Sequence, residues 1–111
     1  MRRFFAVAGL VAVFTVPMVA TAANLSNGSS QTCPAGQIGT WHFVNNQTGG
    51  AAAGTLTAIF SSGTVVTVAS AVLQKTQHFN VSAAGTLIDA STNLPGKLVL
   101  SDFSCEEPKK G

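Results

Sequence analysis

Residues 54–69 read GTLTAIFSSGTVVTVA, and this stretch decides the fold. It holds two apolar runs, Thr55–Phe60 (TLTAIF) and Thr64–Ala69 (TVVTVA), and each run begins at a Gly-Thr step. Glycine supplies a turn and β-branched threonine favours extended backbone, so each step predicts the start of a β-strand. The first run alternates with the period of two that one buried face requires, with Leu56, Ala58 and Phe60 opposite Thr55, Thr57 and Ile59.

Short β-branched runs of the same kind lie on both sides of this stretch. Gly, Asn, Ser and Pro separate them, and this spacing predicts an all-β domain. The fold that fits best is a small antiparallel β-sandwich of six to seven strands, immunoglobulin-like in architecture only. Residues 71–77 (AVLQKTQ) allow a helical turn. The other predicted strands are Thr40–Asn45 (TWHFVN), Gln77–Ser82 (QHFNVS), Thr86–Ala90 (TLIDA) and Lys97–Phe103 (KLVLSDF).

Alternation within these runs predicts which side chains face the core. Trp41 and Phe43 share one face of their run, with His42 on the other. Phe79 and Val81 likewise oppose His78, Asn80 and Ser82. The last run is expected to place Leu98, Leu100 and Asp102 on one side, with Val99, Ser101 and Phe103 on the other.

Two cysteines, Cys33 and Cys105, bracket the predicted strands. In an exported chain an even pair is most simply a disulfide, and this one closes a loop of 72 positions (105 minus 33). Such a bridge contributes about 4 kcal/mol in the chain-entropy treatment. Free thiols or an intermolecular link are the alternatives. The sandwich is therefore expected over residues 33–105, after a flexible lead-in at 24–32 and before a solvated tail at 106–111.

The first 23 residues have the order of a secretory signal peptide. Arg2 and Arg3 precede an uncharged apolar run at residues 4–16, Pro17 follows it, and residues 20–22 (ATA) form a small-x-small cleavage site. A membrane anchor is the alternative, but the apolar run is shorter than the roughly 20 residues of a spanning helix. We expect a secreted or cell-surface protein with no stable membrane insertion after cleavage.

The formal charge of +2 comes from the two arginines of this leader. Without them, four lysines face four acidic residues, and four minus four leaves zero. Nucleic-acid binding needs several cationic contacts to phosphates, so it is not expected. Docking on anionic membranes is disfavoured for the same reason. A neutral surface lacks mutual repulsion, which favours self-association.

The stretch Gly39–Gln47 (GTWHFVNNQ) follows Cys33, and Gln77-His78-Phe79 and Cys105 come after it. This pattern resembles small modules in uncharacterised secreted or surface proteins of bacteria. The resemblance covers most of the chain beyond the leader. It implies no known activity and assigns no functional residue.

His42 and His78 occupy matching settings, Trp-His-Phe and Gln-His-Phe. If their strands are neighbours, the two imidazoles share an outer face and begin a zinc or copper site. Two ligands are too few on their own, and Asp89 and Asp102 are the candidates to complete the set. A pair of half-exposed strand histidines is the simpler interpretation, so no metal or other cofactor is predicted.

Trp41 together with Asn45, Asn46 and Gln47 forms a candidate ligand-binding set. An aromatic ring beside amide side chains is typical of sugar-binding surfaces. The competing interpretation is that Trp41, the single tryptophan, fills the core beside the disulfide. That interpretation is preferred because a small domain has few large side chains with which to build its core.

Taken together, these features predict an exported, non-catalytic binding or adhesion module whose partner is a glycan or another surface protein. A self-assembling structural subunit of the cell envelope or matrix is the first alternative. A small secreted enzyme is the second. It is disfavoured because the chain has no GxSxG nucleophile motif and, before Glu106, only Asp89 and Asp102 as carboxylates.

Overall fold

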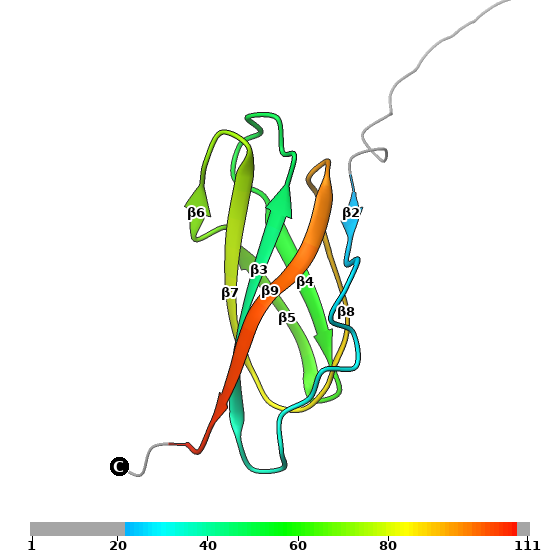
Figure 1. The fold of residues 1–111 in the computed structure, drawn as a ribbon, viewed down its shortest axis with the longest axis vertical. Coiled ribbons are helices and arrows are strands. Elements are labelled where there is room, and N and C mark those ends of the chain that lie inside the picture. The colour runs from blue at the N-terminus through cyan, green and yellow to red at the C-terminus, as the bar shows by residue number, and fades with distance from the viewer. Residues whose placement is uncertain (1–21, 109–111) are drawn as a thin grey trace, which may run out of the picture.

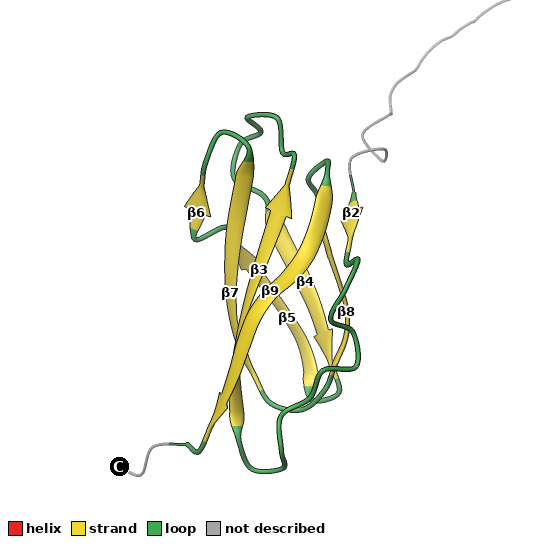
Figure 2. Cartoon of the chain, in the orientation of Figure 1, coloured by secondary structure: helices red, strands yellow, loops and turns green. Residues whose placement is uncertain are grey.

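The computed structural model describes residues 22–108. The strands of this region form two antiparallel sheets (Figures 1 and 2). They pack face to face, and the predicted all-β sandwich is confirmed. The described residues include no helix with the length and apolar character needed to cross a membrane. One sheet has the order β2 (Ala23–Asn24), β8 (Leu87–Thr92), β4 (Thr55–Phe60), β5 (Gly63–Val68), and the other β6 (Ala71–Val72), β7 (Thr76–Ala83), β3 (Ile38–Asn46), β9 (Lys97–Glu106).

The placement of the first and last strands distinguishes this sandwich from an immunoglobulin domain, although both have two packed layers. Within residues 22–108 the first strand is β2, and it lies beside the penultimate strand, β8, instead of beside its successor. In the other sheet β3 lies between β7 and β9, and its register with β7 runs without a break from Gly39 to Asn46. The long central strand β3 therefore holds this sheet together and presents its outward side chains to both neighbours.

The predicted strands agree closely with the observed ones, and β4 coincides with its predicted run. The helical turn allowed for residues 71–77 is wrong. Ala71 and Val72 form β6, which pairs with the start of β7, and the Leu73 amide donates to the Thr76 carbonyl across the turn at 2.8 Å. Ladder hydrogen bonds to β7 therefore replace the local bonds of a helix.

The predicted signal peptide lies outside the described residues except for Ala22 and Ala23. Ala23 is already part of the domain, since it is buried in β2 against β8. The next residues cover the edge of β9. The amide of Ser26 donates to the Leu98 carbonyl, and the side chain of Asn27 both accepts from the Leu100 amide (2.8 Å) and donates to its carbonyl (3.3 Å). The segment predicted as a flexible lead-in is thus hydrogen-bonded to the sandwich, which begins at Ala23 instead of Cys33.

Large apolar side chains from both sheets fill the space between them, as the predicted alternation requires. Those with no exposed surface include Trp41, Phe43, Phe79, Leu56, Leu87 and Leu98.

The burial predicted for Trp41 is confirmed. Its ring stacks on Phe103, with centroids 4.6 Å apart and planes 6° from parallel, and it meets Phe60 at a tilt. The indole N–H donates to the Ala83 carbonyl at 3.1 Å. The one polar atom of the buried ring is therefore satisfied, which removes the main cost of burying it.

A β-bulge in β9 explains why Phe103 is available to Trp41. The residue opposite His42 is Asp102, but the residue opposite Phe43 is Leu100, so Ser101 is extra. Beyond the bulge the alternation reverses, because an inserted residue shifts every later side chain to the other face. The predicted grouping of Asp102 with Leu100 is therefore wrong: Asp102 is exposed and Phe103 turns towards the core.

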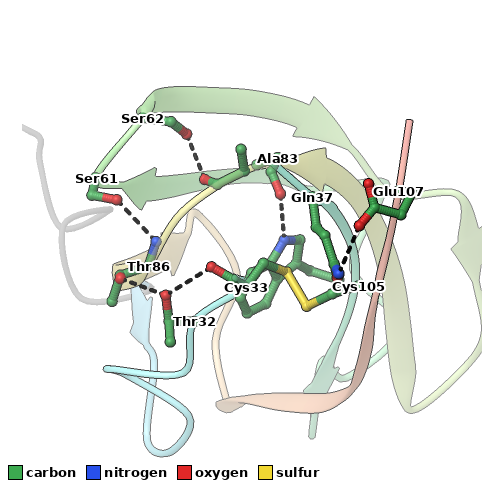
Figure 3. Close-up of a disulfide and its surroundings, with 11 residues drawn as sticks. Thr32, Cys33, Gln37, Ser61, Ser62, Ala83, Thr86, Cys105 and Glu107 are labelled. Carbon is green, nitrogen blue, oxygen red and sulfur yellow. Dashed lines mark hydrogen bonds between the residues drawn. A yellow bond between two sulfur atoms is a disulfide. The ribbon is translucent and has the colours of Figure 1, made fainter. Parts of the chain in front are cut away.

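The predicted Cys33–Cys105 disulfide is present (Figure 3). It joins the loop before β3 to the last strand, with the two Cα atoms 5.6 Å apart. Close packing at Gly39 brings the bridge against the indole, since a Cβ placed there would lie 2.5 Å from Trp41 Nε1 and 2.7 Å from Cys33 Sγ. Beside the bridge, the hydroxyl of Thr86 donates to that of Thr32 at 2.8 Å. The disulfide and the indole thus form one packed end of the core.

Candidate functional site

His42 of β3 and His78 of β7 lie on the outer face of the β6-β7-β3-β9 sheet. In the register between the strands His42 is opposite Asn80 and His78 is opposite Val44, so the two imidazoles are diagonal neighbours. His42 Nε2 and His78 Nδ1 are 2.9 Å apart, and the ring centroids are 5.1 Å apart. Both side chains are half-buried. The expected sharing of one outer face by the two histidines is confirmed.

A chain of hydrogen bonds sets the positions of the imidazole protons. The Ser70 hydroxyl donates to the His78 carbonyl, so its oxygen accepts from Asn80 Nδ2 at 3.1 Å. The other amide atom, Asn80 Oδ1, then faces His42 Nδ1 at 2.7 Å and accepts its proton. With its proton on Nδ1, neutral His42 accepts at Nε2, and His78 Nδ1 is the donor. We call His42, His78 and Asn80 the imidazole cluster.

Asp102 is the acidic residue nearest the imidazole cluster in the register, because the bulge places it opposite His42. It also lines a shallow groove of about 330 Å³ at the β9 edge, between Asn27 and Gln31 on one side and residues 100–103 on the other. Within residues 22–108, no three side chains of the His, Cys, Asp and Glu types come together as a metal-ligand set. The cluster therefore offers two nitrogen ligands, and Asp102 lies opposite His42 in the register without joining them as a third ligand.

The candidate sugar-binding set of Trp41, Asn45, Asn46 and Gln47 does not form one surface. Trp41 and Asn45 have no exposed area, Asn46 is half-buried and Gln47 is exposed. Alternation along β3 turns residues 41 and 45 towards the core. There, Asn45 Nδ2 donates to the Pro95 carbonyl at 2.9 Å and its Oδ1 accepts from Thr92 at 2.6 Å. Asn45 thus ties the turn after β8 to β3.

Gln77 is a buried polar residue that the sequence analysis missed. Its Oε1 accepts from the Gly54 amide at 2.8 Å, and its Nε2 donates to the carbonyls of Ala51 and Ala52, each at 3.0 Å. It therefore fixes the loop that leads into β4. The available signal was its spacing from Phe79, because a residue two positions before a core aromatic on a strand also faces inward.

The outer face of β4 and β5 carries uncharged threonines and exposed aliphatic residues, and Asp89 of β8 lies at its border, opposite Ile59. Val66 and Val68 of β5 are 63% and 64% exposed, and they lie opposite Thr57 and Thr55 of β4. Ile59 extends this surface along β4. β5 ends its sheet, so no strand of residues 22–108 pairs with its outer backbone edge. We call this surface the β4-β5 face; it consists of Thr55, Thr57, Ile59, Thr64, Val66 and Val68.

Single exposed aliphatic residues are normal on soluble proteins, but a group beside an open sheet edge is typical of an interaction surface. The molecule therefore has two candidate sites on opposite sheets, the imidazole cluster and the β4-β5 face. Comparison with protein-family models, curated proteins and solved structures finds no match for this chain.

Proposed function

We propose that this protein is an exported, non-catalytic binding or adhesion module that acts outside the cell or on its surface, and that it docks a protein partner through the β4-β5 face. The observation that carries the proposal is the exposure of Val66 and Val68 on an edge strand. An extended segment of a partner pairs with the free backbone of such a strand, and side chains on the adjacent face supply selectivity.

Export is supported by two features of the chain. The leader has the order of charged, apolar and small residues that secretion signals share. The disulfide is compatible with an extracellular location, because such bonds persist in oxidising compartments. Edman sequencing of the protein recovered from the culture medium or cell surface tests this part. We expect a mature start at Ala23 or Asn24, and a first residue of Met1 would contradict it.

The docking part is tested by immobilising the disulfide-closed protein and measuring its adhesion to cells of the source organism. The test variant is Val66→Lys, which places a charge on the β4-β5 face. The matched control is Ile38→Lys, because Ile38 is also an exposed aliphatic residue (40%) but begins β3 of the other sheet. We expect adhesion to fall about tenfold or more only in the Val66 variant, the range of a moderate interface hot spot. Equal adhesion by both variants would reject this surface.

Self-assembly is the second candidate function, and the unpaired β5 edge favours it as well. A second copy of the chain can pair there and extend the sheet, which the neutral charge does not oppose. Light scattering across a concentration series separates the two functions. A module that binds other proteins stays monomeric, whereas a structural subunit grows with concentration and stops growing when Val66 is changed to Lys.

A further inference from the structure

We propose that His42 and His78 form a binding site for a divalent transition-metal ion, with Cu²⁺ the preferred ion. His42 would bind through Nε2 and His78 through Nδ1, and water would complete the coordination. The inference concerns the sheet opposite the β4-β5 face and does not depend on the proposed docking function.

The separation of the two nitrogens suits adjacent positions of a square-planar ion. Metal–imidazole bonds are about 2.0 Å long, so nitrogens at 90° lie about 2.8 Å apart and tetrahedral ones about 3.3 Å apart. The hydrogen bond between the rings already holds His42 Nε2 and His78 Nδ1 at 2.9 Å, close to the first of these values. Both rings are half-buried and reach solvent, so His78 can turn about its Cβ–Cγ bond while His42 stays held by Asn80. Among divalent ions, Cu²⁺ has the greatest affinity for nitrogen ligands in this geometry.

The hydrogen-bond network leaves His42 ready to act as a ligand. Its Nδ1 proton is held by Asn80 Oδ1, which leaves the Nε2 lone pair free for a metal. A ligating histidine is usually fixed in this way by an acceptor on its other nitrogen. Asn80 Nδ2 also donates to the Ser70 hydroxyl. Flipping the Asn80 amide would exchange Oδ1 for Nδ2 beside His42 and would break this second hydrogen bond.

Metal binding requires one proton to move on His78. In the metal-free pair His78 Nδ1 carries the proton that His42 Nε2 accepts. On binding, that proton leaves Nδ1 and water returns one to Nε2, so His78 stays neutral and no net proton is released. Both nitrogens then donate a lone pair to the ion. The carboxylate of Asp102, opposite His42, adds a neighbouring negative charge that favours a cation.

The test is a Cu²⁺ titration of the tag-free, disulfide-closed full chain, followed by calorimetry and by electron paramagnetic resonance. His42 and His78 are the only histidines in the sequence, so no other imidazole contributes. We expect one tightly bound ion per chain, with superhyperfine splitting from two coordinated imidazole nitrogens. His42→Ala and His78→Ala should each weaken binding roughly 10- to 100-fold, because each removes one arm of a chelate.

The double variant is the decisive control, and its fold is checked by the emission of the buried Trp41. Binding that is unchanged in a correctly folded double variant, or a resonance signal without two imidazole nitrogens, would overturn the site. The role of Asp102 is tested with a pair of substitutions. Asp102→Asn should weaken Cu²⁺ binding about threefold, as expected for one exposed charge, whereas the control Asp89→Asn on the other sheet should leave binding unchanged. An equal effect of the two substitutions would remove Asp102 from the site.

Discussion

Replacing Trp41 with alanine tests the account of the core most directly. The side chain has no exposed area, and a buried aromatic ring of this kind removes about 150–250 Å² from water. At about 25 cal/mol per Å² this corresponds to about 4–6 kcal/mol, and the Ala83 carbonyl also loses its donor. Measured substitutions of buried aromatic residues by alanine cost about 3–5 kcal/mol, because the surroundings relax in part. We therefore expect a loss of about 3–5 kcal/mol for Trp41→Ala.

That loss is large compared with the stability of the whole domain. At about 0.05–0.15 kcal/mol per residue, the described region has a free energy of unfolding of about 4–13 kcal/mol. Urea unfolding followed by far-ultraviolet circular dichroism is the appropriate assay, because the substitution removes the only tryptophan fluorophore. Trp41→Phe keeps most of the ring and should lose about half as much or less. The control Val66→Ala, at an exposed site, should stay within about 0.5 kcal/mol of the parent. A loss below about 1.5 kcal/mol for Trp41→Ala would refute this account of the core.

Three other changes have defined outcomes. Gly39→Ala places a Cβ against Trp41 Nε1 and Cys33 Sγ, so it should lower the free energy of unfolding in urea by about 1–3 kcal/mol. Tryptophan emission should also shift to the red, and a variant with the parent's stability and emission would contradict the packing at Gly39. Gln77→Ala leaves the Gly54 amide without its acceptor, so hydrogen exchange at that amide should accelerate at least about tenfold, and unchanged protection would show that another acceptor replaces it. Reduction of the disulfide should lower the free energy of unfolding by about 4 kcal/mol, and a shift below about 1 kcal/mol would contradict the loop-closure argument.

The strands were predictable because each carries its own local signal. The run of β4 alternates strictly and is preceded by a Gly-Thr step, and its observed bounds equal the predicted ones. The bulge at Ser101 was not predictable in this way. Its position depends on how β9 matches β3, a relation between segments that are distant in sequence. A one-residue error in that register was enough to exchange the faces of Asp102 and Phe103.

The N-terminal segment shows a different limit. Residues 24–32 (NLSNGSSQT) are small and polar, a composition that also occurs in flexible linkers. Here the polar side chains replace backbone partners: Asn27 bonds both the amide and the carbonyl of Leu100 as a neighbouring strand would. Composition describes what a segment can bond to, but not whether a complementary sheet edge is available.

The residues of the imidazole cluster could be named from the sequence, but their arrangement depends on which strands are neighbours. The pairing of His42 with His78 was predicted on the condition that β3 and β7 are neighbours, which they are. The tautomers depend on Ser70 and Asn80, whose roles no spacing rule indicates. Of the β4-β5 face, alternation predicted only the outward Thr55, Thr57 and Ile59 of β4. The exposed valines of this face follow from the position of β5 at the end of its sheet.

The position of the disulfide also determines how the domain responds to mechanical load. Figure 1 places β2 near one end of the sandwich and the C-terminal end of β9 at the other. A pull between these ends peels away residues 22–32 and then passes through the Cys33–Cys105 bond directly into β9. Fully extended, residues 22–32 span roughly 35–40 Å, whereas residues 22–108 with the bond broken span roughly 290–310 Å. Under tension only residues 22–32 therefore extend. The residues between Cys33 and Cys105 carry no load while the disulfide is intact, so the core stays folded.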